Sequence, residues 1–173
     1  MKNTKKSLLD YTLDELRDLM KEWGYPPYRA AQILDWAYAR KVDSFGKMAN
    51  IPQDLRKKLQ SGLAFSPLRS VKKVPSGLDE TVKYLFEDDE KRTLESVLLP
   101  YDEHNTICVS TQAGCPRKCA FCASGMSTLE KNLSAGEIVA QILLILQDAK
   151  LPRIQNVVFM GMGEPFLNYE NVM

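Results

Sequence analysis

The chain has 173 residues, of which 45% are hydrophobic and 26% charged, as is ordinary for a soluble globular protein. No apolar run approaches the roughly 20 residues of a membrane span, and Asp10, Asp14 and Glu15 stand where a signal peptide would need its apolar core. The composition therefore predicts a cytoplasmic protein without a membrane segment, in which thiols stay reduced.

The net charge of +1 hides an asymmetry along the chain. Residues 1–75 carry 15 Lys and Arg against 8 Asp and Glu, a net charge of +7. Residues 76–173 carry 8 against 14, a net charge of −6. A basic first part is what a phosphate-binding module needs. A merely solvated surface would explain the same charges, so the asymmetry alone leaves both interpretations open.

The first part of the chain predicts short helices. Thr12 and Glu15 have the spacing of a capping box, which begins a helix that Gly24 ends. Apolar residues at helical spacing predict further helices over residues 27–40 and 51–62.

From Leu68 onward the hydrophobic period changes. Residues 68–74, 81–86 and 92–99 are rich in β-forming residues and are separated by turn sequences. These three segments predict an antiparallel β-meander.

The last part of the chain predicts a strand, a helix and a second strand. The strands are expected over residues 106–111 and 154–160, and the helix begins with Ser134 as N-cap and Glu137 at the capping-box position. This order predicts parallel strands joined by a right-handed crossover. In barrels of this kind the active site lies at the carboxyl ends of the strands. The sequence thus predicts an α/β fold.

We expect three segments along the chain. Residues 1–65 form a small helical domain, residues 66–100 a β-meander linker, and residues 101–173 an α/β domain.

All four cysteines lie between Cys108 and Cys122, and three of them have the spacing C-x3-C-x2-C. Thiolates are soft ligands that suit iron–sulfur clusters, zinc and Cu(I). Ordinary 4Fe–4S electron carriers use four cysteines, so three would leave one iron open for a substrate or cofactor. Arg117 and Lys118 would oppose the negative charge of such a site. We interpret this stretch as a tight loop that holds an iron–sulfur cluster.

Three alternatives compete with this interpretation. Structural zinc usually takes two ligand pairs from separate knuckles, whereas this chain has one knuckle and one histidine, His104. Disulfides are a poor fit because the cysteines are crowded and no signal peptide is visible. Buried free thiols are disfavoured by the Pro, Arg and Lys beside them.

Three motifs together carry a resemblance to a known family. They are the stretch that begins at Glu95, the stretch Cys108–Cys122, and Gly-Met-Gly-Glu-Pro at residues 161–165. In type and spacing this set resembles the RlmN type of radical SAM enzymes, the dual-specificity methyltransferases of adenine C2 in 23S ribosomal RNA and transfer RNA. The resemblance covers nearly the whole chain. It implies that residues 1–65 are a helical accessory domain that binds RNA. It also implies that residues 101–173 begin the partial (β/α)6 barrel of a radical SAM domain, of which the chain would hold about two units before stopping in mid-domain.

The resemblance also implies the cofactors and their ligands. Cys115, Cys119 and Cys122 would bind a 4Fe–4S cluster whose open iron chelates S-adenosyl-L-methionine, and an electron from the cluster would split the sulfonium. Gly163 and Glu164 match the loop that binds the methionine end of this cofactor. Without the resemblance, a plain turn with an exposed Glu would explain those two residues.

Two further residues acquire catalytic roles by resemblance. Cys108 would resolve a covalent RNA–protein adduct through a transient disulfide with a methyl-carrying cysteine, and Glu95 would accept a proton. Taken alone, Cys108 could be a fourth ligand or a buried thiol, and Glu95 an exposed strand residue. The family's methyl-carrying cysteine lies far along the chain, and no cysteine follows Cys122 here. We therefore expect these 173 residues by themselves to be inactive as a methyltransferase.

The implied partners are 23S ribosomal RNA, transfer RNA and an electron donor such as flavodoxin, with the protein a monomer. Two rival functions remain. The related Cfr type methylates adenine C8, although Pro165 favours the C2 enzyme. A zinc-stapled RNA-binding module would perform no catalysis, and it would be colourless where an iron–sulfur protein is brown.

Overall fold

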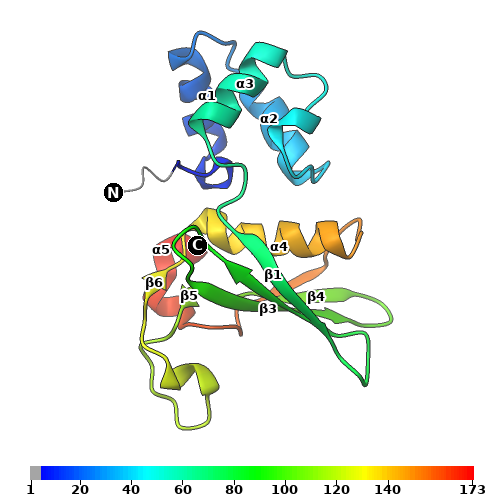
Figure 1. The fold of residues 1–173 in the computed structure, drawn as a ribbon, viewed down its shortest axis with the longest axis vertical. Coiled ribbons are helices and arrows are strands. Elements are labelled where there is room, and N and C mark those ends of the chain that lie inside the picture. Colours follow the sequence, from blue (N-terminus) through cyan, green and yellow to red (C-terminus); the bar gives the residue numbers. More distant parts are fainter. Residues whose placement is uncertain (1–4) are drawn as a thin grey trace. The chain divides into compact units, whose positions relative to one another are not determined.

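The computed structural model describes residues 5–173, and the chain divides into two compact units (Figure 1). Met1–Pro67 form what we call the helical unit, and Leu68–Met173 form the sheet unit. The two units are distinguished by how closely their own residues pack together, and this says nothing about their functions. The predicted functional division into 1–65, 66–100 and 101–173 therefore stays a prediction.

The described part of the helical unit contains three short α-helices, α1 (Leu13–Glu22), α2 (Arg29–Tyr38) and α3 (Gln53–Gly62), with 3-10 turns η1 (Leu8–Asp10) and η2 (Phe45–Lys47). The capping box predicted at the start of α1 is present. The Thr12 N–H donates to Glu15 Oε2 at 2.8 Å, and the Glu15 N–H donates to Thr12 Oγ1 at 3.2 Å. Apolar side chains fill the core, among them the fully buried Leu16, Met20, Ile33, Leu55 and Leu59.

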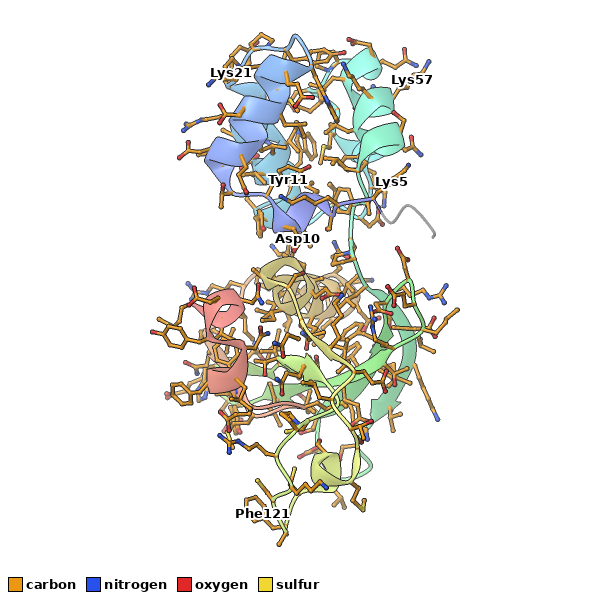
Figure 2. All side chains as sticks on the ribbon, turned by 90° about the vertical axis from the view of Figure 1, so that its left-hand side faces the viewer. Lys5, Asp10, Tyr11, Lys21, Lys57 and Phe121 are labelled. Atoms are coloured by element: carbon orange, nitrogen blue, oxygen red, sulfur yellow. The ribbon has the colours of Figure 1, made fainter. Side chains whose placement is uncertain are left out.

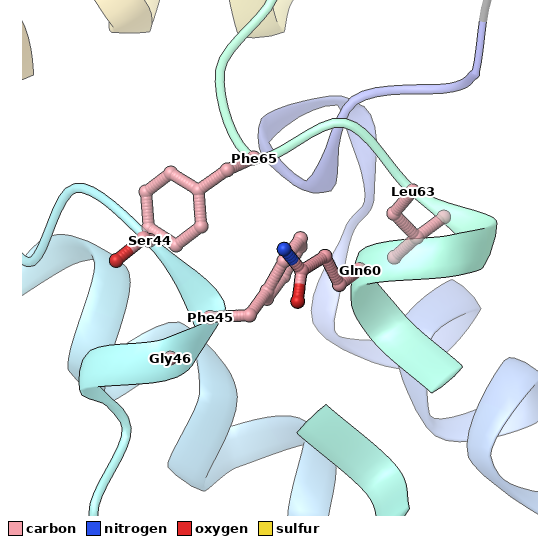
Figure 3. A pocket seen from close by; sticks show the side chains of 6 residues that line it. All are labelled: Ser44, Phe45, Gly46, Gln60, Leu63 and Phe65. Carbon is pink, nitrogen blue, oxygen red and sulfur yellow. The ribbon is translucent and has the colours of Figure 1, made fainter. Parts of the chain in front are cut away.

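A cavity of about 280 Å³ opens within the helical unit (Figure 3). Its lining residues come from η2, the end of α3 and the segment that follows: Ser44, Phe45, Gly46, Gln60, Leu63 and Phe65. The rings of Phe45 and Phe65 meet edge to face with centroids 5.0 Å apart. None of the lining side chains is a metal ligand or an acid–base group, so the cavity is not part of the candidate active site.

A five-stranded sheet forms the centre of the sheet unit, with strand order β1-β2-β3-β4-β7. The strands are β1 (Arg69–Pro75), β2 (Val82–Glu87), β3 (Thr93–Pro100), β4 (Asn105–Cys108) and β7 (Asn156–Val158). The first three pair antiparallel and confirm the predicted meander to within one residue at each end. β4 and β7 are parallel, as the strand–helix–strand order predicted. The fold is therefore the mixed α/β fold that the sequence predicted.

The helix α4 (Ala135–Asp148) covers one face of this sheet and forms part of the connection from β4 to β7 (Figure 1). Leu94, Ser96 and Leu98 are the buried residues of β3, and Ser96 Oγ donates to Gln141 Oε1 of α4 at 2.6 Å. The capping box predicted for Ser134 and Glu137 is present at the start of α4. Of the helices within residues 5–173, none combines the length and apolar character needed to cross a bilayer.

Candidate active site at the carboxyl ends of the parallel strands

The two segments that leave β4 and β7 stay joined by backbone hydrogen bonds. The Val109 N–H donates to Val158 O at 2.9 Å, and the Gly161 N–H donates to Val109 O at 3.1 Å. A side chain at position 161 would collide with this arrangement, because a Cβ there would lie 2.7 Å from both Val109 O and Ser110 Oγ. Parallel strands place their carboxyl ends at one edge, so the motifs that follow each strand meet there.

Glu95 and Cys108 share one face of the sheet. Val97 of β3 pairs directly with Cys108 of β4, and Glu95 lies two residues before Val97 on the same strand. Because side chains alternate between faces and paired residues share one, Glu95 and Cys108 point to the same side. Both are half-buried, and Lys83 Nζ lies 3.1 Å from Glu95 Oε1. The register places the two predicted catalytic residues on the same face of the sheet, while their roles stay predictions.

Burial disfavours the thiolate form of Cys108. Burial raises its pKa above the ordinary value of a cysteine, and a hydrogen bond with the backbone of Met160 offsets part of that effect. The contact with Met160 also ties the thiol to the segment that leaves β7.

The loop Gly161–Glu164 rests on the segment that leaves β4. Gly163 has φ +102°, and a Cβ on it would lie 2.6 Å from Gln112 Cβ, so only glycine fits without strain. The Glu164 N–H donates to Gln112 Oε1 at 2.9 Å, while the Glu164 carboxylate accepts from the Phe166 N–H at 3.1 Å. That second bond caps the 3-10 helix η4 (Pro165–Asn168).

The cysteine loop is closed at its base by a small two-stranded sheet. β5 (Gln112–Ala113) pairs with β6 (Lys131–Asn132), and the Glu130 N–H donates to Ala113 O at 2.9 Å. Gly114 has φ +75°, and a Cβ on it would lie 1.9 Å from Thr128 O. Residues 115–127 therefore leave and return at one narrow base, which we call the neck of the cysteine loop.

The three predicted cluster ligands all lie on this closed loop. Cys115 is buried at the neck, Cys119 is exposed, and Cys122 lies between these extremes. The Cys122 N–H donates to Cys119 O at 3.1 Å, and the Gly125 N–H donates to Cys122 O at 3.0 Å, which forms two successive turns leading into the 3-10 helix η3 (Ala123–Met126).

All four cysteines are free thiols. Across residues 5–173, however, no three His, Cys, Asp or Glu side chains are grouped closely enough to hold a metal ion. The donor chemistry and the closed neck fit a cluster bound by three thiolates, but the thiols would have to converge on it. The assignment of Cys115, Cys119 and Cys122 as ligands therefore stays a prediction.

Apolar side chains project from the tip of the cysteine loop. Phe121 is 93% exposed and Met126 is 87% exposed, and Figure 2 shows Phe121 pointing away from the rest of the sheet unit. Arg117 and Lys118 on the same loop are also exposed. The tip thus presents large apolar groups beside two positive charges.

A buried hydrogen-bond network beneath the loops escaped the sequence analysis. Gln141 of α4 is 0% exposed; its Oε1 accepts from the Ser110 N–H at 2.8 Å, and its Nε2 donates to Ser110 O at 2.9 Å. Ser110 Oγ donates to Glu95 O at 2.6 Å and accepts from the Met162 N–H at 2.8 Å. Ser110 therefore connects β3, which carries Glu95, to the loop that carries Gly163 and Glu164. A glutamine on the apolar face of α4 was the available signal, since buried amides need partners.

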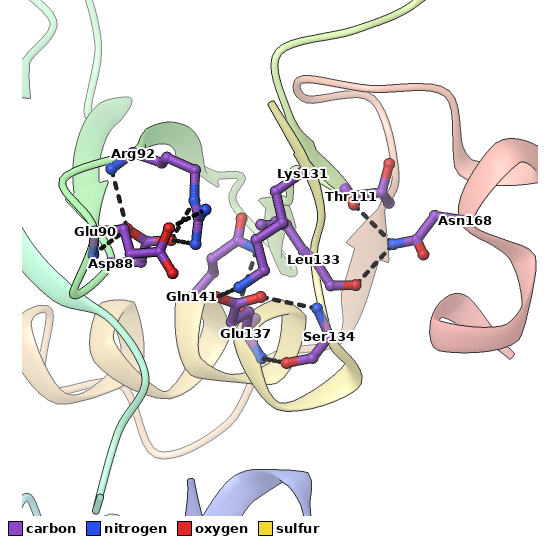
Figure 4. Close-up of polar contacts among 10 residues, drawn as sticks. All are labelled: Asp88, Glu90, Arg92, Thr111, Lys131, Leu133, Ser134, Glu137, Gln141 and Asn168. Carbon is purple, nitrogen blue, oxygen red and sulfur yellow. Dashed lines mark hydrogen bonds and ion pairs between the residues drawn. The ribbon is translucent and has the colours of Figure 1, made fainter. Parts of the chain in front are cut away.

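Asn168 makes a second buried connection at the same edge (Figure 4). Its Nδ2 donates to Thr111 O and Leu133 O, both at 2.8 Å, and its Oδ1 accepts from Asn171 of α5 (Tyr169–Val172) at 2.7 Å. The segment after Glu164 is thereby fixed to both sides of the cysteine loop.

Comparison with known proteins agrees with this geometry. The structure matches that of a radical SAM methyltransferase from Sphaerobacter thermophilus with a TM-score of 0.93 and 42% sequence identity, covering 97% of this chain and 50% of that one. By fold, the chain therefore groups with the radical SAM methyltransferases, and the predicted fold class is confirmed.

Sequence relatives narrow the class. Residues 6–64 match the family described as "Ribosomal RNA large subunit methyltransferase N-terminal domain". The chain is 46% identical over 168 residues to "Probable dual-specificity RNA methyltransferase RlmN" of Thermotoga maritima, covering 97% of this chain and 49% of that protein. The protein of the same name from Bacillus pumilus is 42% identical over 175 residues, with coverages of 100% and 48%. The chain belongs to the RlmN family, and it spans about half the length of the curated relatives it matches.

Proposed function

We propose that the protein methylates C2 of adenosine in 23S ribosomal RNA and in transfer RNA, with a 4Fe–4S cluster and S-adenosyl-L-methionine as cofactors. The observation that carries this proposal is the 46% identity to a dual-specificity RNA methyltransferase over 97% of the chain. The meeting of the cysteine loop and the Gly161–Glu164 loop at one edge of the sheet supports it independently.

Cys115, Cys119 and Cys122 would hold the cluster, which together with S-adenosyl-L-methionine supplies one-electron chemistry when bound. The chain's own part is to bind and orient. The left-handed backbone at Gly163 lets this loop pack directly onto Gln112, which would hold the loop in place for a ligand. The Glu164 carboxylate, which now accepts one backbone hydrogen bond, would accept bonds from the cofactor's ammonium group.

Glu95 and Cys108 would act on the substrate from the same face of the sheet. The ion pair with Lys83 orients the Glu95 carboxylate, which would take up a proton. Cys108 would resolve the adduct between RNA and a methyl-carrying cysteine, and burial raises the pKa of its thiol. No cysteine follows Cys122 within residues 123–173, so the methyl-carrying cysteine is not among them.

The surface of the helical unit supports RNA as the substrate. Arg40 lies 4.3 Å from the centre of the Trp36 ring, Lys58 lies 5.2 Å from that of Trp23, and Lys6 lies 3.9 Å from that of Tyr11. Single-stranded nucleic acid binds surfaces that combine such rings with positive charge. An electron donor such as flavodoxin, a monomeric state and a cytoplasmic location complete the proposal.

The cofactor part is tested by anaerobic purification with iron and sulfide analysis. We expect a brown protein that absorbs in the blue-violet, and an alanine at Cys115, Cys119 or Cys122 should abolish iron loading. Cys108→Ala is the matched control, because it removes a thiol of the same stretch and should retain iron. Zinc in the wild-type protein, or undiminished iron in the three variants, would refute the assignment.

The activity part is tested with the protein at its full encoded length. Incubation with 23S ribosomal RNA or transfer RNA and S-adenosyl-L-methionine should yield 2-methyladenosine, identified by mass spectrometry of digested nucleosides. A product methylated at C8 would mark the protein as a Cfr-type enzyme instead, and the absence of any methylated adenosine would overturn the proposal.

A further inference from the structure

Gln112 lies where the neck of the cysteine loop meets the Gly161–Glu164 loop. It is the first residue of β5, at the neck of the cysteine loop, and its side chain is 0% exposed. Its backbone N–H donates to Met162 O at 3.2 Å, which already ties the two loops together.

Both ends of the Gln112 amide are occupied, each by a different segment. Oε1 accepts from the Glu164 N–H at 2.9 Å, and Nε2 donates to Asn132 Oδ1 of β6 at 2.7 Å. The amide therefore links the backbone of Glu164 to the strand that returns from the cysteine loop.

Gly163 makes this contact unusually close. A Cβ on Gly163 would lie 2.6 Å from Gln112 Cβ and 2.8 Å from the Gln112 backbone nitrogen. The Gly163 backbone is thus packed directly onto Gln112, so that Gln112 determines both the position of Gly163 and the direction of the Glu164 N–H. If this buried amide lost one of its hydrogen bonds, the former partner would be left unsatisfied at a cost in free energy. The arrangement therefore resists displacement.

We propose that Gln112 is a positioning residue, which sets the Gly163–Glu164 backbone at a fixed place relative to the cysteine loop so that one S-adenosyl-L-methionine molecule can be held from both sides. This inference rests on the proposed function, because it assumes that both loops take part in binding that cofactor. It assigns to Gln112 a role in cofactor affinity that is separate from holding iron, since the hydrogen bonds of its amide go to Glu164 and Asn132.

The test compares three variants of the anaerobically prepared protein. Gln112→Met keeps the side-chain length and removes both hydrogen bonds. Asn132→Ala removes only the partner of Nε2 and changes an exposed residue, so that folding is not at risk. Gln155→Met is the matched control, because Gln155 Oε1 also accepts a backbone N–H across β4 and β7, that of Asn105 at 2.9 Å, but at the amino ends of these strands.

Iron and sulfide per chain and the dissociation constant for radiolabelled S-adenosyl-L-methionine are measured for each protein. Gln112→Met should keep its iron and bind the cofactor about tenfold more weakly, as expected when the buried hydrogen bond to the Glu164 N–H is lost together with that to Asn132. Asn132→Ala should bind about threefold more weakly, since the bond to Glu164 persists but the amide is less well oriented. Gln155→Met should bind within about twofold of the wild type.

A readout without cofactor comes from hydrogen exchange in the metal-free protein. The Glu164 amide should exchange faster in Gln112→Met than in the wild type, whereas the Val109 amide, bonded to Val158 O, should not change.

The outcomes separate the two claims. A wild-type protein that binds no S-adenosyl-L-methionine overturns the proposed function and this inference with it. If the wild type binds, the inference alone is overturned when Gln112→Met binds equally well, or when Gln155→Met loses as much affinity. If Gln112→Met does not fold, Asn132→Ala decides, and unchanged affinity in that variant counts against the inference.

Discussion

The helical unit and the sheet unit bury different kinds of side chain. Within residues 5–67, the buried polar side chain is Ser7. The sheet unit buries nine, namely Asp88, Ser96, Thr106, Ser110, Thr111, Gln112, Glu137, Gln141 and Asn168. Apolar packing is tolerant of small shifts, whereas buried hydrogen bonds specify directions. Apolar packing therefore holds the helical unit together, whereas buried hydrogen bonds also fix the geometry of the loops in the sheet unit.

The largest effect should come from the neck of the cysteine loop. Gly114→Ala places a Cβ 1.9 Å from Thr128 O in a left-handed backbone, so the neck must open, at a cost of about 4 kcal/mol or more. Urea unfolding should show the lower stability, and iron loading should fail. Gly77→Ala is the control, because nothing lies within 4 Å of a Cβ there, and its stability should change by less than about 0.5 kcal/mol. Equal stabilities for the two variants would contradict the tight neck.

The next effect sharpens the contrast between the two units. Gln141→Leu leaves the Ser96 hydroxyl and the backbone of Ser110 without partners inside the sheet unit, at a cost of about 2–3 kcal/mol. Gln32→Leu in the helical unit removes only a half-buried bond to Arg29 and should cost less than about 0.5 kcal/mol. Chemical denaturation of both variants checks the prediction, and similar costs would erase the contrast.

The two capping boxes allow a matched comparison in which the expected loss of stability is of intermediate size. Thr12→Ala and Ser134→Ala each remove a side chain that accepts from the third residue of its helix, at a cost of about 1 kcal/mol. We expect Ser134→Ala to cost more. Its partner Glu137 is buried and also pairs with Lys131 at 2.7 Å, whereas the box around Thr12 is exposed. Thermal unfolding of the two variants measures the difference, and a larger loss for Thr12→Ala would contradict it.

The smallest effect concerns acid sensitivity. Lys73, at 2.5 Å, and the Tyr84 hydroxyl, at 2.7 Å, lower the pKa of Asp148 below its usual range. Its carboxylate therefore adds stability above the unfolded-state pKa of about 3.9, and that stability is lost as the pH falls through the lower folded-state value. Because the pair is partly exposed, Asp148→Asn should cost only about 0.5 kcal/mol at pH 6.

The check is urea unfolding at pH 6 and near pH 2.5. The difference between Asp148→Asn and the wild type should shrink at the lower pH, because Asp148 takes up a proton in the unfolded chain below its ordinary pKa of about 3.9. A difference that stays constant would mean that the charge of Asp148 contributes nothing.

Local features of the fold could be predicted from sequence, because their causes are local. Thr12 and Ser134 begin their helices as predicted, since a capping box needs only residues three apart. The meander strands could also be predicted, from their β-forming residues and the turn sequences between them. The strand predicted over residues 106–111 proved shorter, since β4 ends at Cys108 and the chain then bends toward the neck.

The geometry of the candidate site depends on contacts that sequence does not display. Glu95 and Cys108 share a face only because Val97 pairs with Cys108, and a register shifted by one residue would have separated them. Ser110, Gln112 and Gln141 read as ordinary polar residues until α4 and the loops are packed around them. The two-residue strands β5 and β6 are too short to leave a periodic pattern.

The neck at Gly114 has a consequence for the order of events during maturation. Because the ends of segment 115–127 already meet, capture of a metal cluster does not have to supply the entropy of closing a loop. Small zinc modules lack such a preformed closure and remain unfolded until the ion arrives. We therefore expect this chain to fold first and to receive its inorganic centre afterwards.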